Sequence, residues 1–301
     1  MASSLPEKIL LATDGSQDAA LAARAAAEIA QRGGAELHLV HVWQDIPSPH
    51  AHAYIERELK ARGQETLDEQ VAAVERLGAS VADRHLVEGR TADAILWLAD
   101  RIGAGLIVLG SRGLGRLKRL LVGSVAEGVV HGSRFPTLVI RGGENAWPPL
   151  WLVLGDDGSE ASRAAGRLAA AIGSLFEAEA TVLRAYPELP AVDDEERRSD
   201  ARMADDELRR QQRLLEERAR DLEGYLGKRP KTRIAAGDAA EVLVDAAETG
   251  GGGEAAPGKP LIAVGSRGLG LAGRLRLGSV STRVLNAASV PVLIHPAAEE
   301  A

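Results

Sequence analysis

Short, nearly continuous apolar runs alternate along the chain with longer stretches in which apolar residues recur at helical spacing. An apolar run of about four to eight residues between turn residues is typical of a buried strand. The sequence therefore predicts strands at 8–12, 37–43, 105–109 and 137–140, and again at 151–154, 181–186, 260–264 and 290–294.

The stretches between these runs predict helices of two kinds. Alanine-rich helices are expected at 17–31 and 160–173, and longer, highly charged helices at 55–77 and 195–226. Continuous apolar strands separated by helices indicate a parallel sheet that helices cover on both faces. We predict an α/β fold made of doubly wound units.

The sequence contains an internal repeat. Three motifs recur in the same order: Asp-Gly-Ser at 14–16 and 157–159, Gly-Ser-Arg-Gly-Leu-Gly at 110–115 and 265–270, and Gly-Ser-Val at 123–125 and 278–280. The offset between copies grows from 143 (Ser16 to Ser159) to 155 (Gly110 to Gly265), and a glycine run at 250–253 predicts a surface loop within the longer copy. We predict two domains, 1–145 and 146–301, joined by a stretch rich in glycine and proline.

Composition narrows the possible functions. The 301 residues contain no cysteine, which excludes disulfides, thiolate catalysis and cysteine-based zinc sites. The net charge of −7 and the 3% aromatic content argue against nucleic acid as a partner. No apolar run is long enough for a secretory signal or a membrane span, so we expect a cytoplasmic protein without a membrane partner.

The repeated glycines have a spacing suited to holding a phosphate, because backbone N–H groups can approach an anion closely where no Cβ intervenes. Ser124 and Glu127 have capping-box spacing, which predicts that Ser124 caps a helix whose free amides favour an anion. The alternative is that the glycines only form turns. Basic residues between the glycines could offset phosphate charge or simply be solvated: Arg116, Lys118, Arg119, Arg274 and Arg276.

Asp14 and Asp157 follow the first predicted strand of each copy. A carboxylate would repel a polyphosphate, so a nucleotide would turn its ribose hydroxyls or adenine amine toward these residues. The alternative is that each aspartate, like Ser16 and Ser159, caps the following helix.

No familiar catalytic or metal motif occurs. The seven histidines do not repeat between the copies, and His50-Ala51-His52 lacks a nearby third ligand, so we interpret His50 and His52 as surface residues. HExxH, Ser-His-Asp and P-loop lysine patterns are missing. We predict no catalytic residue and leave a metal site open.

The spaced glycines with their upstream Asp-Gly-Ser resemble the ATP-binding branch of the universal stress protein family, over nearly the whole chain. The resemblance implies two tandem domains of the adenine-nucleotide alpha-hydrolase type, each a five-stranded parallel sheet with helices on both faces. It implies ATP, with or without Mg²⁺, at the strand ends. It further implies that the last strands, 137–140 and 290–294, pair as an intramolecular pseudo-dimer, and the whole chain could pair again as a homodimer.

The resemblance also implies the residues of both sites. In the first domain they are Ala12, Asp14, Val42, Leu109, Gly110, Gly113, Gly123, Ser124 and Val125. In the second they are Gly155, Asp157, Ala185, Val264, Gly265, Gly268, Gly278, Ser279 and Val280. Because Ala185 is smaller than Val42 and Asp156 replaces Thr13, the second site departs further from the family pattern.

The favoured hypothesis is an ATP-binding stress-response regulator or sensor with little or no turnover. Two rivals stay open. One is a weak Mg²⁺-dependent ATPase or nucleotidyl-transfer enzyme in which Asp14 or Asp157 helps to hold the metal. The other is a structural or interaction module that binds no nucleotide.

Overall fold

The computed structural model describes residues 5–44, 52–113, 122–186, 196–250, 258–266 and 277–297, with the backbone alone at 52–53 and 196–205. Several sequence predictions lie outside these residues. They are Gly268, the basic residues between the glycines, His50, and the predicted loop at 250–253 apart from Gly250. No helix in the described ranges is both long and apolar enough to cross a membrane.

The N-terminal half contains, in chain order, β1 (Lys8–Ala12), α1 (Gln17–Gly33), β2 (Glu36–Trp43), α2 (His52–Arg76), β3 (Val81–Glu88), α3 (Thr91–Ile102), β4 (Leu106–Gly110), α4 (Ser124–Gly132) and β5 (Thr137–Ile140). After a short 3-10 helix, η1 (Glu144–Ala146), the C-terminal half repeats the pattern with β6 (Trp151–Gly155), α5 (Glu160–Ser174), β7 (Glu179–Tyr186), α6 (Glu196–Leu226), β8 (Lys231–Ala236), α7 (Ala239–Thr249), β9 (Pro260–Gly265), α8 (Ser279–Ala287) and β10 (Val292–His295).

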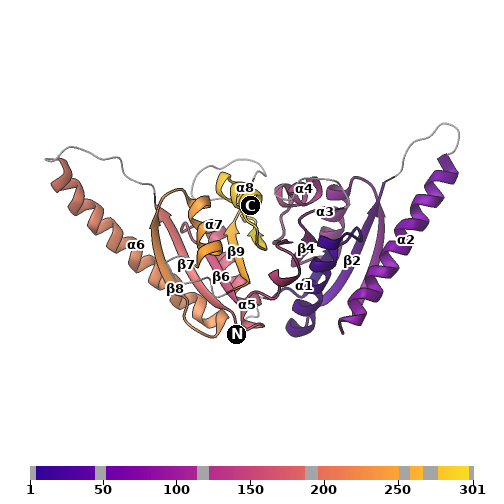
Figure 1. Cartoon of the computed structure of the whole chain (residues 1–301), viewed down its shortest axis with the longest axis horizontal. Helices are drawn as coiled ribbons and strands as arrows, with labels where there is room; N and C mark the ends of the chain where they lie inside the picture. Colours follow the sequence, from indigo (N-terminus) through magenta and orange to yellow (C-terminus); the bar gives the residue numbers. More distant parts are fainter. Residues whose placement is uncertain are drawn as a thin grey trace.

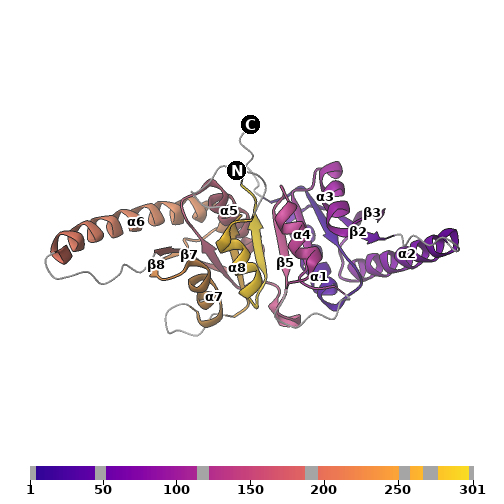
Figure 2. The same ribbon diagram turned by 90° about the horizontal axis from the view of Figure 1, so that it is seen from above.

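The strands form one ten-stranded sheet in the order β3-β2-β1-β4-β5-β10-β9-β6-β7-β8. Neighbours within each half are parallel, whereas β5 and β10 pair antiparallel at the centre. The halves therefore extend to either side of this junction, with α2 and α6 at opposite ends of the molecule (Figure 1; Figure 2 shows the same order from above). The predicted pairing of the last strands is confirmed, and so is the predicted architecture of two tandem, doubly wound domains.

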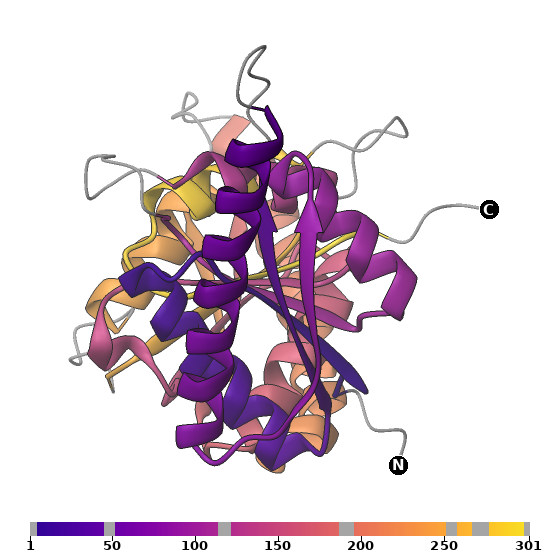
Figure 3. The same ribbon diagram turned by 90° about the vertical axis from the view of Figure 1, so that its right-hand side faces the viewer.

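Helices cover both faces of the sheet because the inner strands β1, β4, β5, β6 and β9 carry apolar side chains on both faces. Helices α1, α2, α5 and α6 contribute to one buried cluster, which includes Leu11, Leu138 and Leu154. Helices α3, α4, α7 and α8 contribute to a second cluster on the other face, which includes Leu10 and Val153. Figure 3 views the N-terminal half from its end, with α2 running in front of the strands. Each cluster contains residues of both halves, so the two cores are continuous across the central junction.

Side chains also fasten the two halves together. The buried guanidinium of Arg141 donates from Nη1 to the carbonyl of Leu285 on α8, at 2.6 Å. Burial lowers the pKa of Arg141 from its ordinary value, the charge of Arg112 lowers it further, and Asp18 opposes both effects. Trp147, between the halves, is buried and donates from its indole N–H to Glu28 on α1. The exact boundary predicted at 145/146 stays a prediction.

Candidate functional site

A cavity of about 260 Å³ opens at the carboxyl ends of β1, β2 and β4, next to the first turns of α3 and α4. Within the half's strand order β3-β2-β1-β4-β5, the direction of winding reverses between β1 and β4, which is where doubly wound sheets place their ligands. All nine residues that the sequence predicted for the first domain line this cavity: Ala12, Asp14, Val42, Leu109, Gly110, Gly113, Gly123, Ser124 and Val125.

The cavity has an apolar end and a polar end. Val40 and Val42 of β2 and Ile95 of α3 form an apolar wall that suits a flat, uncharged ring. At the other end, α4 begins at Ser124, and the first amides of a helix lack partners inside the helix. The positive end of the helix dipole lies there too, so this end favours an anionic group.

Close packing requires glycine at three positions of this site. An ideal Cβ on Gly110 would lie 2.6 Å from the carbonyl carbon of Asp18, so α1 could not pack as closely on β4. A Cβ on Gly123 would lie 3.2 Å from the carbonyl oxygen of Ser111, which accepts the N–H of Gly123. A Cβ on Gly113 would run into the carboxylate of Asp14. Glycine at these positions therefore keeps the cavity walls close together.

The capping box predicted at Ser124 is wrong. The N-cap of α4 is Gly123, in extended backbone conformation with φ −71° and ψ 150°, and no side chain caps the helix. Ser124 is instead the first helical residue, because the backbone bond from Gly123 to Ser111 fixes where the chain turns into the helix. Ser124 still stands at the helix N-terminus as predicted, and its side chain is exposed along the cavity.

Asp14 has the helix-entry role that the alternative interpretation gave it. Its Oδ1 accepts the backbone N–H of Ser16 at 3.0 Å, and Ser16 in turn caps α1 by accepting the N–H of Ala19. Asp14 nonetheless lines the cavity. Asp14 therefore both shapes the entry to α1 and lines the cavity.

A buried carboxylate that the sequence analysis overlooked anchors the glycine loop. Asp18, on the first turn of α1, accepts hydrogen bonds from Oγ of Ser111 at 2.8 Å and from Nε and Nη2 of Arg112 at 3.0 and 3.1 Å. Its side chain is 11% exposed. Arg112, the arginine of the repeated motif, therefore positions the loop, and its bidentate ion pair with Asp18 fixes the direction of the loop.

We expect Asp18→Ala to lower the free energy of unfolding by about 2–3 kcal/mol, because it leaves the buried Ser111 hydroxyl and the Arg112 charge without their acceptor. Urea denaturation followed by tryptophan fluorescence measures the change. The matched control is Asp93→Ala, at the start of α3, whose ion pair with Arg90 is largely exposed and should contribute less than about 1 kcal/mol. Equal effects of the two substitutions would contradict the anchoring role.

The second domain places its predicted residues at equivalent positions. Gly155 ends β6, Ala185 lies near the end of β7, and Val264 and Gly265 end β9. Gly278 is the N-cap of α8, with Ser279 and Val280 opening the helix. A Cβ on Gly265 would lie 2.6 Å from the backbone nitrogen of Ser162, which repeats the packing seen at Gly110.

The second site nevertheless differs in its walls. Leu243 of α7 matches Ile95 of α3 in position, and its methyl groups lie 3.1–3.2 Å from where a Cβ on Gly155 would be. Leu243 thus occupies space that the alanine methyl at Ala12 takes in the first domain. Ala161, the second residue of α5, stands where Asp18 stands on α1, so the carboxylate anchor for the loop is missing from this position.

Asp156 takes part in a different arrangement from Thr13, its first-domain counterpart, whereas Asp157 accepts the N–H of Ser159 as Asp14 accepts that of Ser16. Asp156 is buried and pairs with Arg184 of β7 and, at 3.7 Å, with Nε of Arg218 of α6. Both aspartates line a charged cavity of about 530 Å³ beside α5 and α6. Burial lowers the pKa of Arg218 from its ordinary value, whereas Asp156 and Asp221 raise it. The extra carboxylate that the sequence placed beside the second nucleotide site is thus neutralised on the other face of the sheet.

Other cavity residues of the first domain lay outside the sequence predictions. They are Thr13, Ala19, Val40, Thr91, Ile95, Ser111, Arg112 and Ala126. Several of them lie at a strand end or a helix start, which is a signal that could have identified them. Val40, for example, is two residues before Val42 on the same face of β2. Thr91 and Ile95 could not be placed without the third strand, which the hydrophobic pattern did not reveal.

Comparison with known proteins matches both halves to one family. The sequence profile of the universal stress protein family matches residues 6–141 and 152–296. A universal stress protein of Thermus aquaticus is 38% identical over 133 residues, which cover 44% of this chain and 97% of that protein. A universal stress protein structure from Archaeoglobus fulgidus shares the fold, with TM-score 0.66, 20% identity, and coverage of 99% of this chain and 100% of that one. Another universal stress protein, solved in complex with cAMP, is 26% identical, with TM-score 0.38 and coverage of 45% of this chain and 97% of that one.

Proposed function

Because the chain belongs to the universal stress protein family, we propose that it is a nucleotide-loaded regulator of the stress response that binds ATP in its N-terminal domain. The observation that carries the proposal is the cavity at the switch point of the first half, which is lined by all nine first-domain residues that the family resemblance implies. The family assignment comes from the relatives, and the proposed ligand class comes from the chemistry of the cavity walls.

The lining suits an adenine nucleotide in one orientation. The apolar wall formed by Val40, Val42 and Ile95 takes the base, and Asp14 accepts from ribose hydroxyls or the adenine amine. The phosphates then lie toward Gly123 and the opening turn of α4, where free amides and the helix dipole favour negative charge. ATP brings Mg²⁺ to such a site with its own phosphate oxygens.

The proposal includes little or no hydrolysis of the bound ATP. Asp14 is the one carboxylate among the described residues that line the cavity, and its Oδ1 is engaged by the Ser16 amide. A nucleotide held mainly by backbone groups and apolar contacts is bound without being activated for attack. The proposed role is therefore that of a loaded or empty switch.

The two domains are proposed to bind with unequal affinity. The side chain of Leu243 narrows the space above Gly155 in the second domain. Ala161 stands in place of the aspartate whose carboxylate holds the loop in the first domain. We expect about one ATP per chain at nucleotide concentrations that saturate the first site.

Gly113→Ala is expected to weaken ATP binding at least about tenfold, because a Cβ at this position forces the Asp14 carboxylate out of place. Equilibrium dialysis of the full chain with ATP and Mg²⁺ gives affinity and stoichiometry. AMP is the comparison ligand, and it should bind more weakly than ATP because it lacks most of the charge directed at α4.

The matched control is Gly268→Ala, the same change in the second copy of the motif, which should leave the stronger site unaffected. The proposal fails if millimolar ATP does not bind, or if Gly113→Ala binds as the unaltered protein does. Loss of binding in Gly268→Ala alone would assign the stronger site to the second domain.

A further inference from the structure

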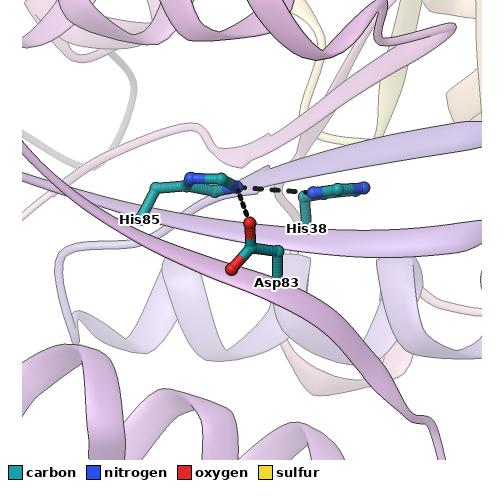
Figure 4. A group of neighbouring side chains, drawn as sticks. All are labelled: His38, Asp83 and His85. Atoms are coloured by element: carbon teal, nitrogen blue, oxygen red, sulfur yellow. Dashed lines mark hydrogen bonds and ion pairs between the residues drawn. The ribbon is translucent and has the colours of Figure 1, made fainter.

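Three side chains with metal-ligating atoms gather on the sheet of the first domain, and none of them is among the residues that line the cavity. His38 lies on β2, and Asp83 and His85 lie on the neighbouring edge strand β3. One nitrogen or oxygen of each residue lies within 4.8 Å of the others. Figure 4 shows the two imidazoles facing each other edge to edge, with the Asp83 carboxylate turned toward the nitrogen of His85.

We propose that His38, Asp83 and His85 form a site for a divalent transition-metal ion such as Zn²⁺. Nδ1 of His38 and Nε2 of His85 are 3.3 Å apart, and Nε2 of His85 is 3.6 Å from Oδ2 of Asp83. Zinc–nitrogen bonds of about 2.0–2.1 Å in a tetrahedron separate neighbouring ligand atoms by about 3.3–3.4 Å. The ligand atoms thus have nearly the required spacing, and the two imidazoles, whose planes differ by 15°, must turn so that both nitrogens point at one ion.

A β-bulge brings the three side chains together. The register of β2 and β3 shifts between Leu37 and His38, so that Leu37 faces Val81 while His38 faces Asp83. The extra residue, Ala82, puts Asp83 and His85 on the same face of the sheet as His38. Without the shift, His38 would lie opposite Ala82, and both β3 ligands would point to the other face.

The polar atoms around His38 support a bound cation. His38 is 8% exposed, and its Nε2 is buried without a hydrogen-bond partner among the described residues. Oε2 of Glu36 lies 3.6 Å from that atom. The negative charge on this side favours the tautomer with the proton on Nε2 and leaves Nδ1 as a ligand; an outer-shell carboxylate orients many metal-binding histidines in the same way.

The position of Asp83 also suits a metal ligand. Its Oδ1 accepts the backbone N–H of Arg84 at 2.8 Å, which leaves Oδ2 directed toward His85. Its side chain is 60% exposed, so an ion and its water ligands can reach the site from solvent. Two imidazoles and one carboxylate favour zinc, nickel, cobalt or copper over Mg²⁺ and Ca²⁺, which prefer all-oxygen sites.

The second domain lacks the ligands at the equivalent positions. Thr181 occupies the place of His38 on β7, with Lys231 opposite it, and Arg233 lies opposite Leu183. The strands there pair without a register shift. A threonine with two basic side chains would repel a cation, so the expected stoichiometry is one ion per chain.

Isothermal titration of chelator-treated full-length protein with ZnCl₂ tests the site, and titration with Co²⁺ gives a visible spectrum that reports its geometry. We expect one ion per chain, at least about a 100-fold loss of affinity in His85→Gln, and about a 10–100-fold loss in Glu36→Gln. Asp83→Asn changes an exposed side chain and should lose affinity while keeping the fold, as circular dichroism can check.

The matched control removes two other histidines together, His50→Gln and His52→Gln, and should bind zinc as the unaltered protein does. The proposal is overturned if His85→Gln and Asp83→Asn retain the original affinity, if no zinc binds at micromolar concentration, or if the control variant is the one that loses it. None of these outcomes depends on nucleotide binding, so this inference stands or falls separately from the proposed function.

Discussion

Replacing Asp156 with alanine is expected to destabilise the protein by about 3–5 kcal/mol, because two guanidinium groups then share a buried space without their carboxylate. The side chains of Asp156, Arg218 and Arg184 are only 4%, 8% and 12% exposed. Nη2 of Arg218 already has no hydrogen-bond partner among the described residues and lies against Gly166. Loss of Asp156 leaves Asp221, at the surface side of Arg218, as its remaining ion pair.

The first domain shows which uncharged arrangement the same space can hold. There the hydroxyl of Thr13 donates to Gln70 at 3.1 Å, and Nδ1 of His41 donates to the Thr13 carbonyl at 2.9 Å. Gln70 follows buried Leu67 by three residues, as Arg218 follows buried Leu215, so the two sets correspond.

A triple variant, Asp156→Thr with Arg184→His and Arg218→Gln, should therefore recover most of the stability that Asp156→Thr alone loses. Urea denaturation of the three proteins measures the recovery. Glu160→Gln is the control, since its ion pairs with Arg163 and Arg167 are exposed and contribute little. A loss below about 1 kcal/mol in Asp156→Ala would contradict the assigned role of the buried carboxylate.

The second large effect is expected from Gly110→Ala. An alanine Cβ would lie 2.6 Å from the carbonyl carbon of Asp18 and 2.8 Å from its oxygen, and these are backbone atoms that cannot rotate away. Helix α1 must then move off β4, which should cost about 1–3 kcal/mol or more in stability. ATP affinity should fall as well, because Gly110 and Ala19 both line the cavity.

The same substitution at Gly224 is the control. Gly224 lies inside α6, and no atom outside its own helix lies within 4 Å of a Cβ placed there. Gly224→Ala should stabilise the protein by up to about 1 kcal/mol, because alanine is the better helix former. Denaturation curves that move in the same direction for both variants would refute the steric interpretation of Gly110.

The sequence alone determined the eight inner strands of the sheet and indicated where the first cavity lies. Buried parallel strands produce continuous apolar runs, so 8–12 and 137–140 were predicted with the bounds that the structure has. The repeated glycine motif located the carboxyl ends of the strands, and all nine first-domain residues that the family resemblance implies line the cavity. Local pattern was sufficient here because chain direction and strand order place these segments at one edge of the sheet.

The hydrophobic pattern did not reveal the outer strands. β3 and β8 lie at the two edges of the sheet and carry several exposed or half-buried polar residues, so their apolar periodicity is weak. The bulge between β2 and β3 cannot be read from either segment alone, since register is a property of the pair. For this reason nothing in the sequence connected His38 with His85, which are 47 positions apart.

Tertiary structure alone decided what the charged residues do. The Asp18–Arg112 pair is 94 positions apart in the chain, and Asp156 meets Arg184 and Arg218 from two other elements. The motif predicted where the backbone lines a cavity, because glycine acts locally. Whether an arginine holds a loop, offsets a buried aspartate or faces solvent depends on what the folded chain brings within a few ångströms of it, and sequence spacing does not carry that information.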